Sequence, residues 1–90
     1  MQLVWKPMAL EDRERIFDWL SAQNVQAAIA LDDEFDLFAE RVCIDPLIYR
    51  ESRVAGLREA VIRPNYIMIY QIRGVELHIV RIIHTAQRWP

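Results

Sequence analysis

The 90-residue sequence has few of the residues that mark unusual protein classes. It contains one cysteine, two glycines and four prolines, which excludes a disulfide-stapled scaffold, a collagen-like repeat and a flexible linker. One Cys and two His far apart in the chain give no zinc-binding spacing. No apolar run approaches the roughly 18–20 residues that span a bilayer, and the N-terminus lacks the regions of a signal peptide. We therefore expect a cytoplasmic protein with no metal, cofactor or membrane partner.

Lysine is also scarce, since Lys6 stands beside ten arginines. The net charge of −2 is unevenly distributed, because residues 1–43 carry −5 and residues 44–90 carry +3. Guanidinium groups bind carboxylates and phosphates bidentately, so the basic half indicates either ordinary surface ion pairs or a partner-binding region. The acidic total argues against a nucleic-acid-binding protein.

Apolar residues are abundant for so short a chain, at 53% against 27% charged residues. This composition predicts a single globular domain covering residues 1–90. So small a domain has to bury most of its apolar residues or cover them with a partner. We therefore expect a protein that functions in a complex.

The hydrophobic pattern predicts elements in the order β-α-α-β-β-β. Pro7 suits the first position of the first helix, and Asn24 suits the N-cap of the second. Residues 44–54 are expected to form an irregular loop, and Arg73 and Gly74 a hairpin turn. The resulting α+β fold is a helical hairpin packed on a mainly antiparallel four-stranded sheet. The predicted ranges are 2–6, 8–22, 25–42, 57–62, 66–72 and 75–83.

Strand alternation predicts which side chains of the last two strands face the helices. If Ile72 pairs with Val75, then Tyr66 pairs with Arg81. The helix-facing set is then Tyr66, Met68, Tyr70, Ile72, Val75, Leu77, Ile79 and Arg81. The opposite face is mixed, and we interpret it as solvent-facing with apolar patches or as a partner-binding surface. Its members are Ile67, Ile69, Gln71, Glu76, His78, Val80, Ile82 and His84.

Several polar side chains favour structural roles. The acidic face with Asp32, Asp33 and Asp36 is interpreted as solvated rather than metal-binding, because no glycine-bearing calcium loop accompanies it. Cys43 ends an apolar helix face and is expected to be a core thiol rather than a nucleophile. Glu59 is interpreted as an ion-pair partner in preference to a catalytic base.

Five short segments have a characteristic order and spacing along the chain. They are Trp5–Asp12, Gly56–Glu59, Pro64–Tyr66 leading into Ile69–Ile72, Ile79–His84 and Gln87–Pro90. In this order they resemble the RelE/ParE superfamily of bacterial toxins. The resemblance implies a growth-inhibiting toxin encoded beside an antitoxin that wraps and neutralises it. It also implies that operator DNA is contacted only through the antitoxin.

Two activities are known in this superfamily. RelE-like toxins cleave messenger RNA in the ribosomal A site with Arg, Lys or His and Glu residues on the concave sheet face, whereas ParE-like toxins poison DNA gyrase and lack those residues. Ile67 stands where many RelE-like nucleases have an Arg. The Lys-rich patch that supports ribosome docking is absent, and such docking needs many phosphate contacts. The resemblance therefore favours a ParE-like toxin directed at gyrase.

Two other interpretations stay open. The alternative is a ribosome-dependent mRNA interferase, which needs a base, a proton donor and a cation; its candidate catalytic residues are His84, Arg88, Arg53 and Glu51. A third is a toxin retained only for binding its antitoxin. For a partner-binding surface, the expected residues are Arg50, Arg53, Arg58, Ile67, Ile69, His78, His84, Arg88 and Trp89.

Four side chains in this half of the chain also suit structural roles. His84 can cap backbone groups at the end of its strand, and His78 suits a half-buried packing position. Arg81 is expected to snorkel or stack at the edge of the core. Trp89 is expected to pack the C-terminal tail against the fold.

Overall fold

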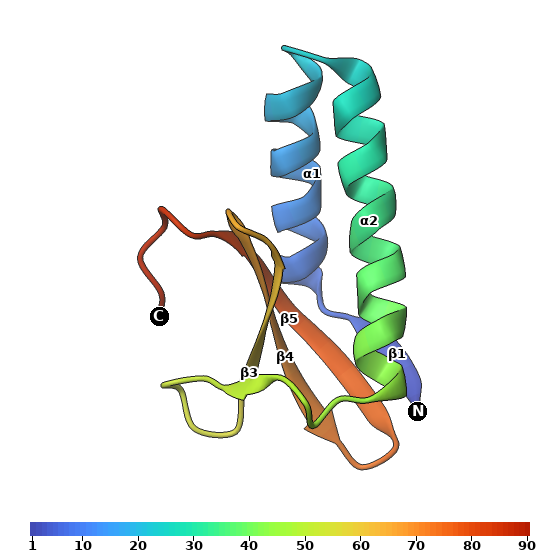
Figure 1. The fold of residues 1–90 in the computed structure, drawn as a ribbon, viewed down its shortest axis with the longest axis vertical. Coiled ribbons are helices and arrows are strands. Elements are labelled where there is room, and N and C mark those ends of the chain that lie inside the picture. Colours follow the sequence, from blue (N-terminus) through green and yellow to red (C-terminus); the bar gives the residue numbers. More distant parts are fainter.

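In the computed structural model, which describes residues 1–90, two helices cover one face of a five-stranded sheet (Figure 1). The sheet order is β1-β5-β4-β3-β2, with β1 parallel to β5 and the other neighbours antiparallel. The predicted α+β class and helical hairpin are confirmed, and the sheet has one strand more than predicted. The elements are β1 (Gln2–Trp5), α1 (Pro7–Ser21), α2 (Val25–Ile44), β2 (Arg50–Glu51), β3 (Arg58–Arg63), β4 (Tyr66–Arg73) and β5 (Glu76–His84).

Both helices begin where the local sequence predicts. Pro7 lies in the first turn of α1, where its missing N–H costs no hydrogen bond. The side chain of Asn24 caps α2 by accepting the Ala27 N–H at 3.0 Å. Neither helix is long and apolar enough to cross a bilayer.

The additional strand, β2, lies within the segment predicted to be an irregular loop. Arg50 pairs with Glu59 of β3, and Glu51 pairs with Arg58. Two residues are too few to show an alternating pattern, so the sequence carries no periodic signal for this strand. The predicted ion-pair role of Glu59 is confirmed, because its Oε1 lies 2.9 Å from Nε of Arg50.

The turn between β4 and β5 lies one residue later than predicted. Gly74 and Val75 form it, and Arg73 pairs with Glu76. Gly74 has a φ of +60°, whereas Val75 is not in the positive-φ region. This pattern matches a hairpin turn with glycine at its first central position. The predicted pairing of Ile72 with Val75 is therefore wrong.

A β-bulge further changes the register of this hairpin. Tyr70 pairs with Ile79 and Ile69 pairs with Arg81, which leaves Val80 as an extra residue in β5. Beyond the bulge the alternation is reversed. Ile82, predicted on the outer face, is therefore fully buried in the core cluster.

The later turn and the bulge together change the partner predicted for Tyr66. Its partner across the sheet is His84 rather than Arg81. Val75, predicted to face the helices, is 78% exposed in the turn. Five of the predicted helix-facing residues do belong to the core cluster: Tyr66, Met68, Tyr70, Leu77 and Ile79.

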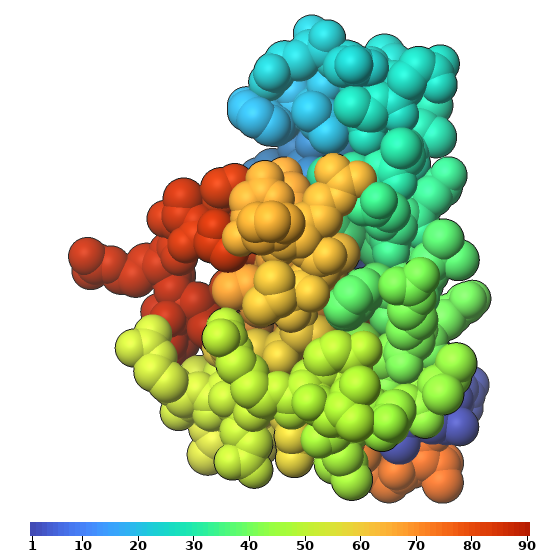
Figure 2. Space-filling model, in the orientation of Figure 1, coloured from blue at the N-terminus to red at the C-terminus, as the bar shows by residue number.

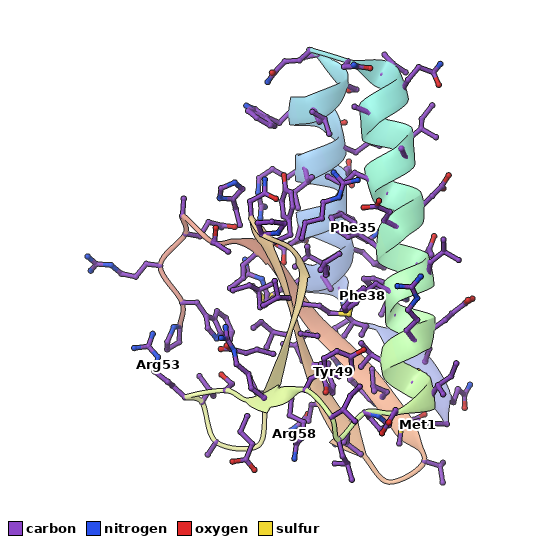
Figure 3. The ribbon with its side chains drawn as sticks, viewed as in Figure 1. Met1, Phe35, Phe38, Tyr49, Arg53 and Arg58 are labelled. Atoms are coloured by element: carbon purple, nitrogen blue, oxygen red, sulfur yellow. The ribbon has the colours of Figure 1, made fainter.

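The core lies between the helical hairpin and the sheet. Phe35 points from α2 toward the sheet (Figure 3) and meets Tyr66 edge to face, with ring centroids 5.9 Å apart. Cys43 packs against this cluster, and burial raises the pKa of its thiol. An apolar contact of this kind supports the predicted role of Cys43 as a core thiol.

One buried carboxylate joins α1 to β5. Because β1 pairs with β5 only as far as Ile79, the rest of that edge lacks a strand neighbour. Asp12, which is 1% exposed, takes that place and accepts the Ile82 N–H at 2.9 Å. Arg81 donates to the same carboxylate at 2.7 and 3.0 Å, and Arg15 donates at 2.6 Å. Arg81 thus lies part-buried at the edge of the core, as predicted, and forms an ion pair with a buried carboxylate.

The pKa of the Asp12 carboxyl follows from these contacts. Burial raises this pKa, but the hydrogen bonds from Arg81, the Ile82 N–H and Arg15 more than offset burial. The pKa therefore lies below its ordinary value of 3.8. The carboxylate is held in its charged form inside the fold.

A second arginine joins the two helices to each other. Arg13 of α1 donates to Asp32 at 2.9 Å and to Asp36 at 2.8 Å, both on α2. Its guanidinium also stacks on Trp5, with 4.5 Å between its carbon and the ring centroid. The side chains of Asp32 and Asp36 remain 35% and 57% exposed in these pairs, and Asp33 is exposed, so the acidic face is solvated as predicted, with Arg13 as an additional partner.

Replacement of Asp12 by alanine is expected to lower the free energy of unfolding by about 3 kcal/mol, because it leaves a part-buried guanidinium and the buried Ile82 N–H without their acceptor. Urea unfolding followed by circular dichroism measures this change. The matched control is Asp33→Ala on the exposed face of α2, which is expected to change stability by less than about 0.5 kcal/mol. Equal losses in the two variants would contradict the role of Asp12.

The same carboxylate predicts a pH dependence. Because its pKa is lower in the folded chain than the ordinary value of 3.8, the unfolded chain binds this proton first as the pH falls. The stabilising contribution is present above that value and is lost as the pH falls through the folded pKa. The advantage of the parent chain over Asp12→Asn is expected to shrink between about pH 7 and about pH 2. Urea unfolding at each pH tests this, and a constant difference would refute it.

Candidate functional site

An open groove of about 580 Å³ lies on the sheet face opposite the helices. In Figure 2 it lies between the C-terminal segment, in red, and the yellow-green segment that follows β2. Its floor is the cross-strand pair Ile67 and Ile83. The walls combine the β2 region with the end of β5 and the C-terminal tail: Arg50, Glu51, Arg53, Glu59, His84, Thr85, Gln87, Arg88 and Trp89.

Backbone hydrogen bonds fold the C-terminal tail along one side of the groove. The His84 N–H donates to Oε1 of Gln87 at 2.6 Å, and the Ala86 N–H donates to Nδ1 of His84 at 3.0 Å. The backbone-capping role considered for His84 is therefore present. Arg53 lies on the opposite wall and donates to the carbonyl of Trp89 (Figure 3). This bond connects the two walls.

The charges along the groove are only partly compensated. Arg50 is paired with Glu59 at 2.9 Å. Arg53 and Arg88 form no ion pair, although both line the groove. Guanidinium groups that lack an acidic partner, beside an apolar floor, are suited to binding carboxylate or phosphate groups of a partner, although Arg53 already donates one N–H to the Trp89 carbonyl.

Most of the residues predicted for the site come together in this groove. All four candidate catalytic residues line it: His84, Arg88, Arg53 and Glu51. Of the expected partner-binding residues, it contains Arg50, Arg53, Ile67, His84, Arg88 and Trp89. No group of three or more His, Cys, Asp or Glu side chains is arranged to hold a metal ion.

Three expected partner-binding residues lie elsewhere. Ile69 is fully buried and His78 is 8% exposed, so neither presents a surface to a partner. Nε2 of His78 instead lies 2.9 Å from Oε1 of Glu76. Arg58 lies outside the groove and donates to the carbonyl of Tyr49 at 2.7 Å. Alternation along a strand indicates which face of the sheet a side chain lies on. It does not indicate how deeply the rest of the protein buries that side chain.

Four groove residues are absent from the sequence-based set: Glu59, Ile83, Thr85 and Gln87. Glu59 comes to the groove through pairing with β2, which has no periodic signal. Ile83 reaches it because the bulge at Val80 reverses the alternation. Thr85 and Gln87 belong to the tail, whose path depends on contacts with the rest of the fold.

A helical hairpin packed on one face of a mainly antiparallel sheet, with a groove on the other face, is the architecture of this chain, and a match to a family model identifies it as a toxin of the RelE/ParE superfamily. The family described as the ParE toxin of the type II toxin-antitoxin system, parDE, matches residues 3–89, and the chain belongs to this family. The resemblance inferred from the sequence segments is confirmed.

Solved structures with the same fold include two bacterial examples. The first is described as the chromosomal ParDE TA system from P. aeruginosa, with 19% identity, a TM-score of 0.84, and coverage of 93% of this chain and 95% of that chain. The second is described as a YoeB/ParE toxin from Agrobacterium tumefaciens, with 13% identity, a TM-score of 0.65, and coverage of 93% and 98%. A search of curated protein sequences found no match.

The Arg53→Ala variant is expected to loosen the C-terminal tail, because it removes the hydrogen bond that links the tail to the opposite wall. One such bond contributes about 0.5–1.5 kcal/mol, so amide hydrogen exchange in residues 85–89 should become about two- to tenfold faster. Exchange measured by NMR tests this. Arg73→Ala, an exposed arginine in β4 without an ion pair, is the control. Unchanged exchange in Arg53→Ala would exclude the tether.

Proposed function

We propose that this chain is a growth-inhibiting ParE-like toxin that acts in the cytoplasm on DNA gyrase and is neutralised by a cognate antitoxin. Membership of the ParE toxin family supports the toxin role. The apolar floor of the groove is the observation that most supports gyrase, rather than RNA, as the target. Ile67 and Ile83 form this floor, at the place where a nuclease of the superfamily would present a cation.

The polar groups around this floor also favour protein binding over RNA cleavage. Phosphodiester cleavage by a 2′-hydroxyl needs a base, a proton donor and a cation for the developing charge. Glu59 is already paired with Arg50. Nδ1 of His84 is occupied by the Ala86 N–H. These bonds engage groups that a nuclease would keep available for the substrate.

The antitoxin partner is supported by charge and by exposed apolar surface. Arg88 forms no ion pair, and Arg53 donates only to a backbone carbonyl, so both guanidinium groups can still bind carboxylates of a partner. Trp19, a large aromatic residue on α1, is 62% exposed, which is typical of residues that partners cover. In this proposal the toxin meets operator DNA only through its antitoxin.

A second candidate function is the ribosome-dependent mRNA interferase. The observation in its favour is that His84, Arg88, Arg53 and Glu51 all line one groove. An imidazole, two guanidiniums and a carboxylate are side chains that RNA cleavage can use. The third interpretation, a chain that only binds its antitoxin, predicts neither activity.

Incubation of the purified chain with gyrase and supercoiled plasmid tests the proposal. We expect inhibition of gyrase with trapped cleaved DNA, and no cleavage of mRNA in a parallel reaction with translating ribosomes. Cuts in the A-site codon would instead establish the interferase. Inactivity in both reactions would leave only antitoxin binding.

A pair of matched variants sharpens this experiment. Ile67→Arg places a charge on the apolar floor and is expected to weaken gyrase inhibition about tenfold, because an apolar contact is replaced by a group that is costly to desolvate. Ile29→Arg makes the same change at an exposed position of α2, on the other side of the sheet from the groove, and should leave inhibition unchanged. Equal effects of the two variants would argue against the groove as the binding site.

A further inference from the structure

The four most exposed large apolar residues of the chain all lie at the end of the molecule opposite the turn between α1 and α2 (Figure 1). Their exposed fractions are 84% for Ile44, 78% for Val75, 67% for Ile48 and 66% for Leu47. Met1 lies at the same end and is 55% exposed. We name these five residues the apolar end.

Contacts between the elements bring the apolar end together from four segments. The Gln2 N–H donates to the Val75 carbonyl at 2.8 Å, which places the N-terminus beside the turn between β4 and β5. Leu47 and Ile72 line one hollow, and Ile72 lies three residues before Val75. Met1 lies beside the last turn of α2 (Figure 3), which ends at Ile44. The five residues therefore form one surface.

The apolar end is separate from the groove, because none of its residues lines that groove. Each of its five side chains is more than half exposed. A contiguous apolar surface made of several large side chains is typical of an interaction site. The fold itself does not cover this surface, so a partner is needed to bury it.

The charges beside the apolar end favour a second copy of the chain as this partner. Arg41 and Asp45 lie one turn apart around Ile44, and both are exposed without an ion pair. Asp45 is the C-cap of α2, where the negative end of the helix dipole disfavours a carboxylate. A surface with one unpaired charge of each sign is complementary to itself, because a two-fold rotation brings each charge to its opposite.

We propose that the apolar end binds a second copy of this chain about a two-fold axis. Ile44 of both copies lies at the axis, and Leu47 and Ile48 extend the apolar contact. Asp45 of each copy pairs with Arg41 of the other. An apolar centre with a polar rim is the usual composition of such an interface. Both grooves stay open in this dimer, so the inference is independent of the proposed target.

Sedimentation equilibrium of the full chain tests the proposal at concentrations from about 1 μM to about 1 mM. We expect a reversible monomer–dimer equilibrium that is half complete below about 100 μM, as for a small interface. Ile44→Arg should weaken it about 100-fold, because a charge is costly to desolvate and a two-fold interface contains each substitution twice. Since Ile44 is mainly exposed, the fold should persist, which circular dichroism verifies.

The chain supplies a matched control in the same helix. Ile29→Arg makes the same change at an exposed position near the other end of α2 and should dimerise as the parent chain does. A chain that stays monomeric up to about 1 mM would overturn the inference. Equal dimerisation of Ile44→Arg and the parent chain would do so as well.

A charge exchange tests the predicted pairing. Asp45→Arg and Arg41→Asp should each weaken the dimer about tenfold, because each places like charges opposite one another in the interface. The double variant exchanges the two charges across the axis and is expected to restore the parent affinity. A double variant weaker than both single variants would contradict the pairing.

Gyrase inhibition measured in parallel identifies another occupant. A monomeric chain whose inhibition is weakened by Ile44→Arg would assign the apolar end to gyrase and overturn the inference. Inhibition by a monomer that Ile44→Arg leaves unchanged would refute the dimer alone. Dimerisation without any gyrase inhibition would refute the proposed target alone.

Discussion

The buried carboxylate of Asp12 is the contact on which the arrangement of the two layers depends. The short β1 leaves half of one edge of β5 without a neighbour, and this carboxylate satisfies the Ile82 N–H there. Through Arg81 the same group fixes the side of β5 that faces α1. The position of α1 in turn brings Trp19 beside His84 at the end of β5. A structural ion pair thus sets which side chains of α1 lie beside the C-terminal end of the sheet.

The uneven charge of the chain has a structural counterpart. In the acidic half, Arg13 is the centre of a clamp that uses two carboxylates of α2 and the ring of Trp5. In the basic half, two arginines of the groove, Arg53 and Arg88, have no acidic partner. Arginine stabilises the fold in both halves, since Arg81 of the basic half pairs with Asp12, but the arginines of the groove divide into the paired Arg50 and the two that lack an acidic partner. A net charge of −2 conceals this division.

The features that the sequence predicts correctly are those that depend on local residue patterns. The two helices, the Asn24 cap and the three longest strands follow from periodicity and capping rules. The bulge at Val80 and the two-residue β2 have no such pattern, and Asp12 is bonded to residues about 70 positions away. Resemblance identified the groove side chains but could not show that Ile69 and His78 are covered. Depth of burial is a property of the assembled fold.

The bulge in β5 has a consequence for comparing toxins of this family by alignment. Val80 adds one residue to the strand, so Ile83 rather than Ile82 reaches the groove. A relative with the same letters but an unbroken strand would turn Ile82 outward and Ile83 inward. Identical residues in a sequence alignment therefore do not establish equivalent positions in the structure. Functional residues near the C-terminus can be transferred between relatives only when both strands contain the extra residue.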